Sequence, residues 1–302
     1  MKIYTKWVKA HCGTLENKTI VVTGGDGSIG YYICYYALFL GAKVIIASLD
    51  TNKCEIVKKD LLKVFPKASI EVKYIDLNKL DMIKPFVDTI AQYKPYILVN
   101  NAGVYHLPKQ QNEYNIERTF AINYIGTSLL TQYMLPILKK NGGKVVYQSS
   151  ISVKWFKKFE LDDVFSNKEP KLTRCYGKSK KEALMDALRL KREGYVIDFA
   201  HPGASATGLF DFKRGGFTKA FNKLIVPLMK LVFNSPSKAS LGVVYALTHD
   251  LQYDEWAGPV HLFNFIGYPK VCKIPKACLD EKVQNELLIK TNSLLPNEFK
   301  LK

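Results

Sequence analysis

The sequence predicts an α/β fold built on one doubly wound, mostly parallel sheet of seven strands with helices on both faces. Short runs rich in valine, isoleucine and aromatic residues alternate with helical patterns from residue 19 onward. This alternation is typical of repeated strand–helix–strand units and therefore of a parallel sheet. A glycine-rich segment follows the first run directly. No linker rich in Pro, Gly or Ser and no internal repeat divides the chain, so we expect a single domain over residues 1–302.

Seven short apolar runs are the predicted strands, because each is suited to burial on both faces of a sheet. They are residues 18–24, 43–48, 69–76, 96–101, 144–150, 195–200 and 259–265. In such a sheet the ligand crevice lies beyond the carboxyl ends of the strands. We expect residues 17–203 to form the core of the domain, residues 204–240 to cover the crevice as a lid, and residues 268–302 to form a C-terminal extension.

Composition narrows the class of protein and its partners. The formal net charge is +17, and residues 212–249 carry six basic residues and no acidic one. No nucleic-acid-binding motif accompanies this charge, so we expect no nucleic acid, with an anionic membrane surface as the alternative partner. No apolar run reaches the ~18–20 residues that span a bilayer, and the N-terminus lacks the pattern of a signal peptide. The expected location is cytoplasmic or peripheral to a membrane. The spacing of cysteine and histidine predicts no metal site.

The first predicted strand runs into the loop TGGDGSIG, which precedes a predicted helix. Glycines at this place let the backbone turn tightly and approach a pyrophosphate, which the helix N-terminus then stabilises. The acidic residue Asp76 ends the third predicted strand, and its position there supports a dinucleotide site of the Rossmann type. The candidate phosphate-binding residues are Thr23, Gly24, Gly25, Asp26, Gly27, Ser28, Ile29 and Gly30.

The end of the second predicted strand decides the choice of cofactor. Enzymes that use NAD place an acid there against the ribose hydroxyls, and enzymes that use NADP accommodate the 2′-phosphate instead. Ser48 can donate a hydrogen bond to a phosphate without repelling it, and Lys53 is within reach of the same group. NADP is therefore favoured over NAD, although Asp50 keeps NAD as the alternative.

Tyr176 and Lys180 lie four residues apart in a segment of strong helix formers. At this spacing both side chains share one face of a helix and can point together into the crevice. An ammonium group beside a phenol stabilises the phenolate and brings the pKa of the tyrosine toward the working range. The pair therefore predicts a tyrosine that exchanges a proton with a substrate.

With these features in order, the sequence resembles the short-chain dehydrogenase/reductase family over nearly its whole length. The matching pieces are TGGDGSIG at 23–30, Asp-Leu at 76–77, NNAG at 100–103, the Asn of FAINYIG at 120–126, the serines at 149–150, YGKSK at 176–180 and HPGASAT at 201–207. The resemblance implies a Rossmann-type domain in which 17–203 bind the cofactor and carry catalysis and 204–240 cover the substrate.

The resemblance also implies a role for each matching residue. Tyr176 is the proton donor or acceptor, and Lys180 lowers its pKa and holds the nicotinamide ribose. Ser150, the second of the two serines, orients the carbonyl or alcohol, and Asn123 supports a water chain to Lys180. Further cofactor contacts are implied for Asp76, Leu77, Asn101, Ala102, Gly103, Pro202, Gly203 and Thr207.

The retinol-dehydrogenase-like members of the family are the most similar in two places. The segment between Ser150 and Tyr176 is longer than usual and looks like the insert of those members, and residues 277–295 resemble their terminal helix. Two positions depart from that pattern. Ser28 replaces a glycine, so that the loop also fits the branch that modifies sugar nucleotides, and Leu49 replaces the arginine usual in relatives that use NADP.

The predicted activity is therefore NAD(P)-dependent hydride transfer between a nicotinamide and a lipophilic alcohol, ketone or aldehyde. The lipophilic substrate is inferred from apolar residues at 216–233. Two alternatives stay open: a non-catalytic NAD(P)-binding regulator or scaffold, and a sugar-nucleotide epimerase or dehydratase of the extended branch. By analogy with the family, the chain can also form a homo-oligomer.

Overall fold

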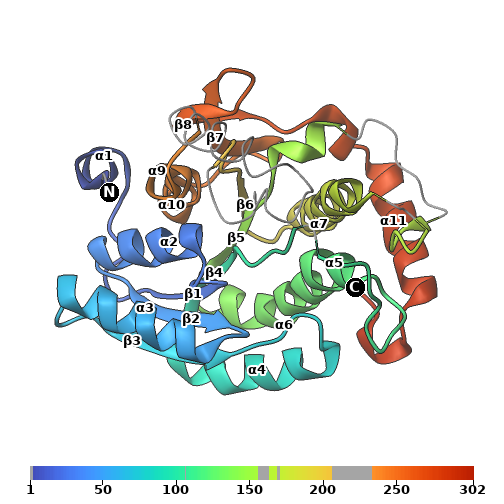
Figure 1. Cartoon of the computed structure of the whole chain (residues 1–302), viewed down its shortest axis with the longest axis horizontal. Helices are drawn as coiled ribbons and strands as arrows, with labels where there is room; N and C mark the ends of the chain where they lie inside the picture. Colours follow the sequence, from blue (N-terminus) through green and yellow to red (C-terminus); the bar gives the residue numbers. More distant parts are fainter. Residues whose placement is uncertain (1–2, 106, 156–162, 169–170, 206–232) are drawn as a thin grey trace, which may run out of the picture.

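The computed structural model describes residues 3–105, 107–155, 163–168, 171–205 and 233–302. Over these residues eight strands form one sheet in the order β3-β2-β1-β4-β5-β6-β7-β8 (Figure 1). Neighbouring strands are parallel except for the last pair. The strands are β1 Thr19–Thr23, β2 Lys43–Ser48, β3 Ile70–Tyr74, β4 Pro95–Asn100, β5 Lys144–Gln148, β6 Ile197–Ala200, β7 Glu255–His261 and β8 Ile266–Lys273.

The sheet has one strand more than predicted, at its C-terminal edge. The apolar run at 259–265 is not a single strand: it ends β7 and contains the turn of an antiparallel hairpin with β8. Leu262, Phe263 and Asn264 all have positive φ in this turn. Two of these three residues are apolar, so only Asn264 carries a turn signal in the sequence. Most of β8 belongs to the segment predicted as the C-terminal extension.

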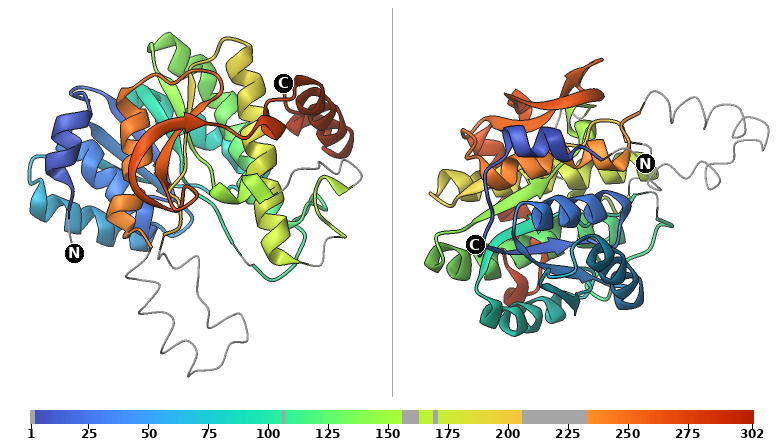
Figure 2. Two further views of the ribbon diagram at one scale, coloured as in Figure 1. Left: turned by 90° about the horizontal axis from the view of Figure 1, so that it is seen from above. Right: turned by 90° about the vertical axis from the view of Figure 1, so that its left-hand side faces the viewer.

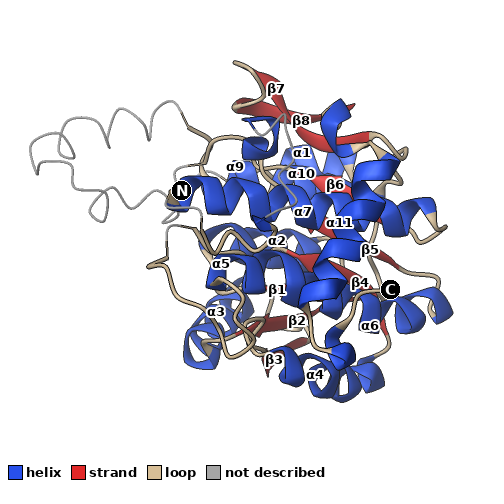
Figure 3. Ribbon diagram, turned by 90° about the vertical axis from the view of Figure 1, so that its right-hand side faces the viewer, coloured by secondary structure: helices blue, strands red, loops and turns tan. Residues whose placement is uncertain are grey.

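Two hydrophobic cores lie on opposite faces of the sheet, with helices over each. Ile20 and Val22 of β1 belong to one core and Val21 to the other, as alternation along a strand requires. The first core includes residues of α1 Thr5–His11, α2 Ser28–Phe39, α3 Thr51–Val64 and α10 Leu241–Thr248. The second includes residues of α4 Ile83–Ile90, α6 Thr127–Lys140, α7 Leu172–Arg192 and α11 Glu281–Leu294. Figure 3 shows the strands lying between these helices.

Shorter elements complete the described chain. They are the α-helices α5 Arg118–Phe120 and α9 Pro236–Ala239, the 3₁₀ turns η1 Leu80–Met82, η2 Ala91–Tyr93, η4 Ile151–Trp155, η8 Lys276–Cys278 and η9 Asn297–Phe299, and the π-helix η3 Ala121–Gly126. The buried hydroxyl of Tyr36 on α2 bonds to Tyr4 N at 2.9 Å and to Ser237 Oγ at 2.8 Å. These bonds attach the start of α1 and helix α9 to α2, and α1 lies beside α10 (Figure 2).

The C-terminal helix packs against the helices that carry the predicted site. α11 contacts α7, and the Thr291 hydroxyl lies 3.0 Å from the hydroxyl of Tyr124. The buried guanidinium of Arg189 on α7 pairs with Asp186 at 2.9 Å and also donates to the backbone carbonyl of Lys302. The end of the chain therefore stabilises the position of α7.

The strand order changes direction between β1 and β4. From β1 the chain continues outward to β2 and β3, and from β4 it continues outward on the other side to β5 and β6. In open α/β sheets this switch point leaves a crevice at the carboxyl ends of the two strands. The glycine-rich loop follows β1, and the NNAG segment begins at the end of β4. The fold thus brings the two segments together at one edge of the sheet.

Candidate active site

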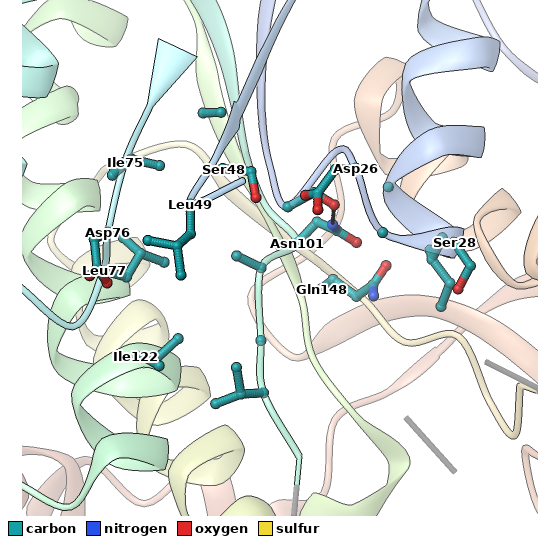
Figure 4. A pocket seen from close by; sticks show the side chains of 18 residues that line it. Asp26, Ser28, Ser48, Leu49, Ile75, Asp76, Leu77, Asn101, Ile122 and Gln148 are labelled. Atoms are coloured by element: carbon teal, nitrogen blue, oxygen red, sulfur yellow. Dashed lines mark hydrogen bonds between the residues drawn. The ribbon is translucent and has the colours of Figure 1, made fainter. Parts of the chain in front are cut away.

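A cavity of about 330 Å³ opens at this switch point (Figure 4). It contains most of the residues predicted to bind a dinucleotide, together with several apolar neighbours. The lining residues are Gly24, Asp26, Gly27, Ser28, Ile29, Gly30, Ala47, Ser48, Leu49, Ile75, Asp76, Leu77, Asn101, Ala102, Gly103, Val104, Ile122 and Gln148. Thr23, Gly25 and Lys53, which were also predicted to bind the cofactor, are not among them.

The glycine-rich loop is shaped by close backbone contacts. Gly24 has φ +63°, a left-handed conformation that favours glycine, and a Cβ atom on Gly30 would lie 2.1 Å from Gly24 O. Asn101 supports the loop, because its Nδ2 donates to Thr23 O at 2.8 Å and to Gly24 O at 3.1 Å. Thr23 itself has a structural role: its hydroxyl accepts from Asn101 N and Ala102 N, both at 3.0 Å. The loop is thus fixed to the end of β4.

The loop leads into α2 in a way that suits an anion. Gly27 is the N-cap residue and has no side chain with which to satisfy the amides of the first turn. Ser28, Ile29 and Gly30 of this first turn line the cavity, so the positive end of the helix dipole lies beside it. The loop and the cavity therefore fit the pyrophosphate of a dinucleotide.

The end of β2 presents a hydroxyl and an apolar side chain to the cavity rather than a carboxylate. Ser48 and Leu49 line it. The carboxylate of Asp50 instead caps α3, accepting from Lys53 N at 2.9 Å. The ammonium of Lys53 lies 3.4 Å from the carboxylate of Asp26 in the glycine-rich loop. The structure therefore places Lys53 in an ion pair at the rim of the cavity.

A second cavity, of about 270 Å³, adjoins the first. Ile29, Asn101, Gly103 and Gln148 line both. The other lining residues of the second cavity are Tyr105, Ser149, Ser150, Ile151, Ser152, Trp155, Thr173, Tyr176, Lys180, Pro202, Gly203, Ala204, Ser205 and Phe265. Ser150, which is far from Tyr176 and Lys180 in the sequence, thus meets them in one space beside the dinucleotide cavity.

Tyr176 lines this second cavity. Its ring packs edge-on against the ring of Tyr105, with centroids 5.0 Å apart. Burial raises the pKa of Tyr176, and its hydrogen bond with the Ser150 hydroxyl opposes that rise. Ser150 Oγ in turn accepts from Ser152 N at 3.2 Å and lies 2.9 Å from Ser152 Oγ. Of the two adjacent serines, Ser150 is the one that contacts Tyr176.

Lys180 lies one helical turn beyond Tyr176 and is also buried. Its ammonium donates to Gln148 O at 3.3 Å, and burial lowers its pKa to about 8. Gly103 leaves the space that the ammonium occupies, because a Cβ atom there would lie 2.9 Å from Lys180 Nζ. The cationic group is therefore held between β5 and the NNAG segment.

Asn123 lies within the π-helix η3 and borders the same small space as Lys180. Its side chain accepts from Val104 N at 2.8 Å and donates to Val104 O at 2.9 Å and to Ser179 Oγ at 3.1 Å. A space of about 10 Å³, close to the size of one water molecule, is lined by Asn123, Lys180 and neighbouring residues. Asn123 thus fixes the loop that follows NNAG.

The segment after β6 closes the second cavity. Pro202 and Gly203 line it. Burial lowers the pKa of His201 to about 3, and its Nδ1 accepts from Gly203 N at 3.3 Å. The neutral imidazole therefore stabilises this turn. The predicted cofactor contact Thr207 lies outside the described residues, as does most of the predicted lid.

Sequence reasoning missed several residues of the second cavity, above all Tyr105 and Gln148. Tyr105 follows NNAG by two positions, and Gln148 directly precedes the serine pair. Their proximity to recognised motifs was the available signal. Which way each side chain points depends on long-range packing, which the spacing does not show.

Comparisons with known proteins identify relatives of the chain. A family model described as short chain dehydrogenase matches residues 18–157. The chain is 32% identical over 221 residues to the chloroplastic short-chain dehydrogenase TIC 32 A of Brassica napus, covering 66% of this chain and 68% of that protein. It is 29% identical over 248 residues to retinol dehydrogenase 13 of Mus musculus, covering 79% and 74%. It is 28% identical over 289 residues to polyprenol dehydrogenase of Homo sapiens, covering 91% and 84%.

A solved structure of an uncharacterised protein from Mycobacterium paratuberculosis has a similar fold. The TM-score is 0.73 at 22% identity, and the alignment covers 94% of this chain and 96% of the other. The similarity in sequence to the plant dehydrogenase, at 32% identity, extends over two thirds of that protein's length. The chain therefore belongs to the short-chain dehydrogenase/reductase family of oxidoreductases.

Proposed function

We propose that the protein transfers a hydride between NADP and a lipophilic alcohol, ketone or aldehyde. The observation that carries this proposal is the meeting of Tyr176, Ser150 and Lys180 in a cavity that adjoins the glycine-loop cavity. Enzymes of this family bind NAD or NADP, and the nicotinamide ring of the bound cofactor supplies or accepts the hydride. In this proposal residues of both cavities hold the cofactor.

In the proposed mechanism Tyr176 exchanges a proton with the substrate oxygen. The Ser150 hydroxyl, already hydrogen-bonded to Tyr176, orients and polarises the same oxygen. Burial, and to a smaller extent the neighbouring Tyr105, raises the pKa of Tyr176 and so holds the phenol neutral. Lys180 supplies the opposing charge from the same face of α7, and Asn123 fixes the loop against which Lys180 packs. In this proposal Tyr176 and Ser150 act on the substrate oxygen, and Lys180 acts on Tyr176.

NADP is proposed over NAD because of the end of β2. Ser48 and Leu49 border the cavity, and the carboxylate of Asp50 is engaged as a helix cap. No side-chain carboxylate of β2 Lys43–Ser48 therefore opposes a 2′-phosphate. The ion pair of Lys53 with Asp26 also neutralises the one acidic group of the glycine-rich loop. This proposal does not require the direct contact of Lys53 that the sequence suggested.

A lipophilic substrate is proposed from the lining of the second cavity. Ile151, Trp155, Ala204 and Phe265 provide apolar surface around the polar group of Tyr176. Retinol dehydrogenase 13 and polyprenol dehydrogenase, to which the chain is similar, are named for lipophilic alcohols. The predicted apolar residues of the lid at 216–233 lie outside the described residues.

We also propose that the protein makes a peripheral contact with an anionic membrane. Among the described residues, no helix is long and apolar enough to cross a bilayer. The hairpin turn between β7 and β8 exposes Leu262 and Phe263, the latter by 88%, and Trp155 at the second cavity is 65% exposed. Vesicles of anionic lipid should sediment the protein and neutral vesicles should not. Equal lack of binding to both would contradict the contact.

The function is tested by binding and then by turnover. Titration of NADPH and NADH, followed by fluorescence, should show binding, tighter for NADPH. In a screen of lipophilic ketones and aldehydes, at least one compound should then oxidise the bound cofactor. Binding without turnover of any of these substrates would favour the regulator or scaffold instead.

A further inference from the structure

Gln148 occupies the boundary between the two cavities. It is the last residue of β5, and it lines both of them. Figure 4 shows this side chain projecting into the first cavity on the side of Asn101 and Ser28. Its backbone carbonyl is the acceptor for the Lys180 ammonium, which fixes the residue relative to Tyr176 and Lys180.

The side-chain oxygen of Gln148 has an unmet hydrogen-bonding capacity. Oε1 is buried, and it has no hydrogen-bond partner in the part of the chain that the structure describes. A buried acceptor without a partner costs free energy, because it has lost its bonds with water. A ligand group that donates to this oxygen would recover that loss when it binds.

The chemistry of a dinucleotide narrows the groups that can do so. The pyrophosphate has only acceptor oxygens, so it cannot satisfy Oε1. The hydroxyls of the nicotinamide ribose can donate, but the family resemblance assigns that ribose to Lys180. The adenine end belongs beside Ser48 and Leu49, at the other side of the first cavity. The carboxamide of the nicotinamide carries both an N–H donor and a carbonyl acceptor. A glutamine amide matches both groups at once, with Oε1 accepting and Nε2 donating.

The position of Gln148 also indicates the nicotinamide carboxamide as its partner. The reactive ring has to lie beside Tyr176 and Ser150, and therefore in the second cavity or at the junction of the two. Gln148 lines that junction, together with Ile29, Asn101 and Gly103. Of these four residues, only Gln148 and Asn101 carry a polar side chain, and the Asn101 amide already bonds to the glycine-rich loop.

We infer that Gln148 recognises the nicotinamide carboxamide and so sets the orientation of the ring toward the substrate. This inference rests on the proposed function, because it requires a nicotinamide cofactor. Gln148 is in this account a positioning residue for the cofactor. It holds the ring by a paired amide contact, while Tyr176 and Ser150 act on the substrate oxygen.

The test compares three ligands on the wild-type protein and on Gln148→Met, which keeps the length of the side chain but removes its hydrogen-bonding groups. The ligands are NADPH, its 3-acetylpyridine analogue, in which a methyl group replaces the carboxamide nitrogen, and 2′-phospho-ADP-ribose, which lacks the ring. The wild-type protein should bind NADPH about tenfold more tightly than the analogue. Gln148→Met should bind these two equally, and the ring-free ligand as the wild-type protein does.

A control variant and a stability measurement separate binding from folding. Gln92→Met, an exposed glutamine distant from both cavities, should leave all three affinities unchanged. Without ligand, Gln148→Met should unfold at the same or a higher temperature than the wild-type protein, because it removes an unpaired buried acceptor. Should methionine disturb the fold, Gln148→Leu serves the same comparison.

Two results would overturn the inference alone. One is a variant that still discriminates NADPH from the analogue as the wild-type protein does. The other is an equal loss of affinity for the ring-free ligand, which would place the contact at the ribose or pyrophosphate. A wild-type protein that binds none of the three ligands would instead overturn the proposed function, and the inference with it.

Discussion

The ammonium of Lys180 occupies the space that a side chain at Gly103 would need, since a Cβ atom at Gly103 would lie 2.9 Å from Lys180 Nζ. This contact links the NNAG segment after β4 to the helix that carries Tyr176. Because the Lys180 side chain packs so closely, its position depends on the residue opposite it. The contact explains why a glycine is needed at this place.

Gly103→Ala should reduce turnover about tenfold or more while costing little stability. The added methyl group displaces the flexible end of Lys180 rather than backbone, and a small displacement of a catalytic group has a large effect on rate. Steady-state kinetics and thermal unfolding would measure the two effects. Gly13→Ala is the matched control, because its Cβ would meet only Thr248 at an ordinary distance of 3.7 Å. Unchanged turnover in Gly103→Ala would contradict the account.

Lys180→Met should stabilise the cofactor-free protein at pH 7 while removing turnover. The pKa of Lys180 falls from 10.5 to about 8 on burial, so between these values the unfolded chain binds more protons and stability rises with pH. Below pH 8 the wild-type protein bears the full cost of burying the charge. The variant, which has the same number of side-chain atoms, should gain about 2–3 kcal/mol at pH 7 and less than half of that at pH 9.5.

Urea unfolding of both proteins at the two pH values would measure this difference. Titration of other groups cancels in the comparison. A variant less stable than the wild-type protein at pH 7 would show that the ammonium stabilises the cofactor-free fold, contrary to this expectation.

Ser48→Asp should reverse the preference for cofactor. A carboxylate at the end of β2 would repel a 2′-phosphate and accept hydrogen bonds from free ribose hydroxyls. The dissociation constant for NADPH should rise by an order of magnitude or more, and that for NADH should fall. Ser48→Ala, which removes the hydroxyl without adding charge, should have a much smaller effect. NADPH affinity that survives the aspartate would argue that the 2′-group binds elsewhere.

Gly30→Ala should disrupt the glycine-rich loop. Its Cβ would lie 2.1 Å from Gly24 O and 2.8 Å from Gly25 Cα, which are backbone atoms that cannot give way locally. The cost should be about 1–3 kcal/mol of unfolding free energy, with loss of cofactor binding. Denaturant unfolding and NADPH titration would test this. Normal binding by a normally stable variant would mean that the loop is not as closely packed as the structure has it.

β3 at the sheet edge is only partly buried, but the other five of the first six strands are largely buried on both faces, which made much of the fold predictable. Their sequences are therefore continuous apolar runs with clear ends, and the structure confirms the parallel sheet. The edge hairpin was harder. Leu262 and Phe263 occupy left-handed turn positions despite being apolar, so the run at 259–265 looked like a strand.

The candidate site shows the same division between local and long-range information. The helical spacing of Tyr176 and Lys180 is local, and both side chains line the second cavity. The partner of Lys53 is not local: the sequence placed its ammonium near a cofactor phosphate, whereas the structure pairs it with Asp26. Likewise, a strand pattern cannot show that Gln148 turns toward both cavities.

Replacement of Tyr176 by phenylalanine tests the central claim most directly. The variant keeps the ring that packs against Tyr105 and loses only the hydroxyl that contacts Ser150. With a substrate found in the ketone and aldehyde screen, NADPH affinity should stay within about twofold of wild type and turnover should fall by about 10²–10⁴-fold. Turnover near the wild-type rate, with NADPH still bound, would show that this hydroxyl is not the proton donor.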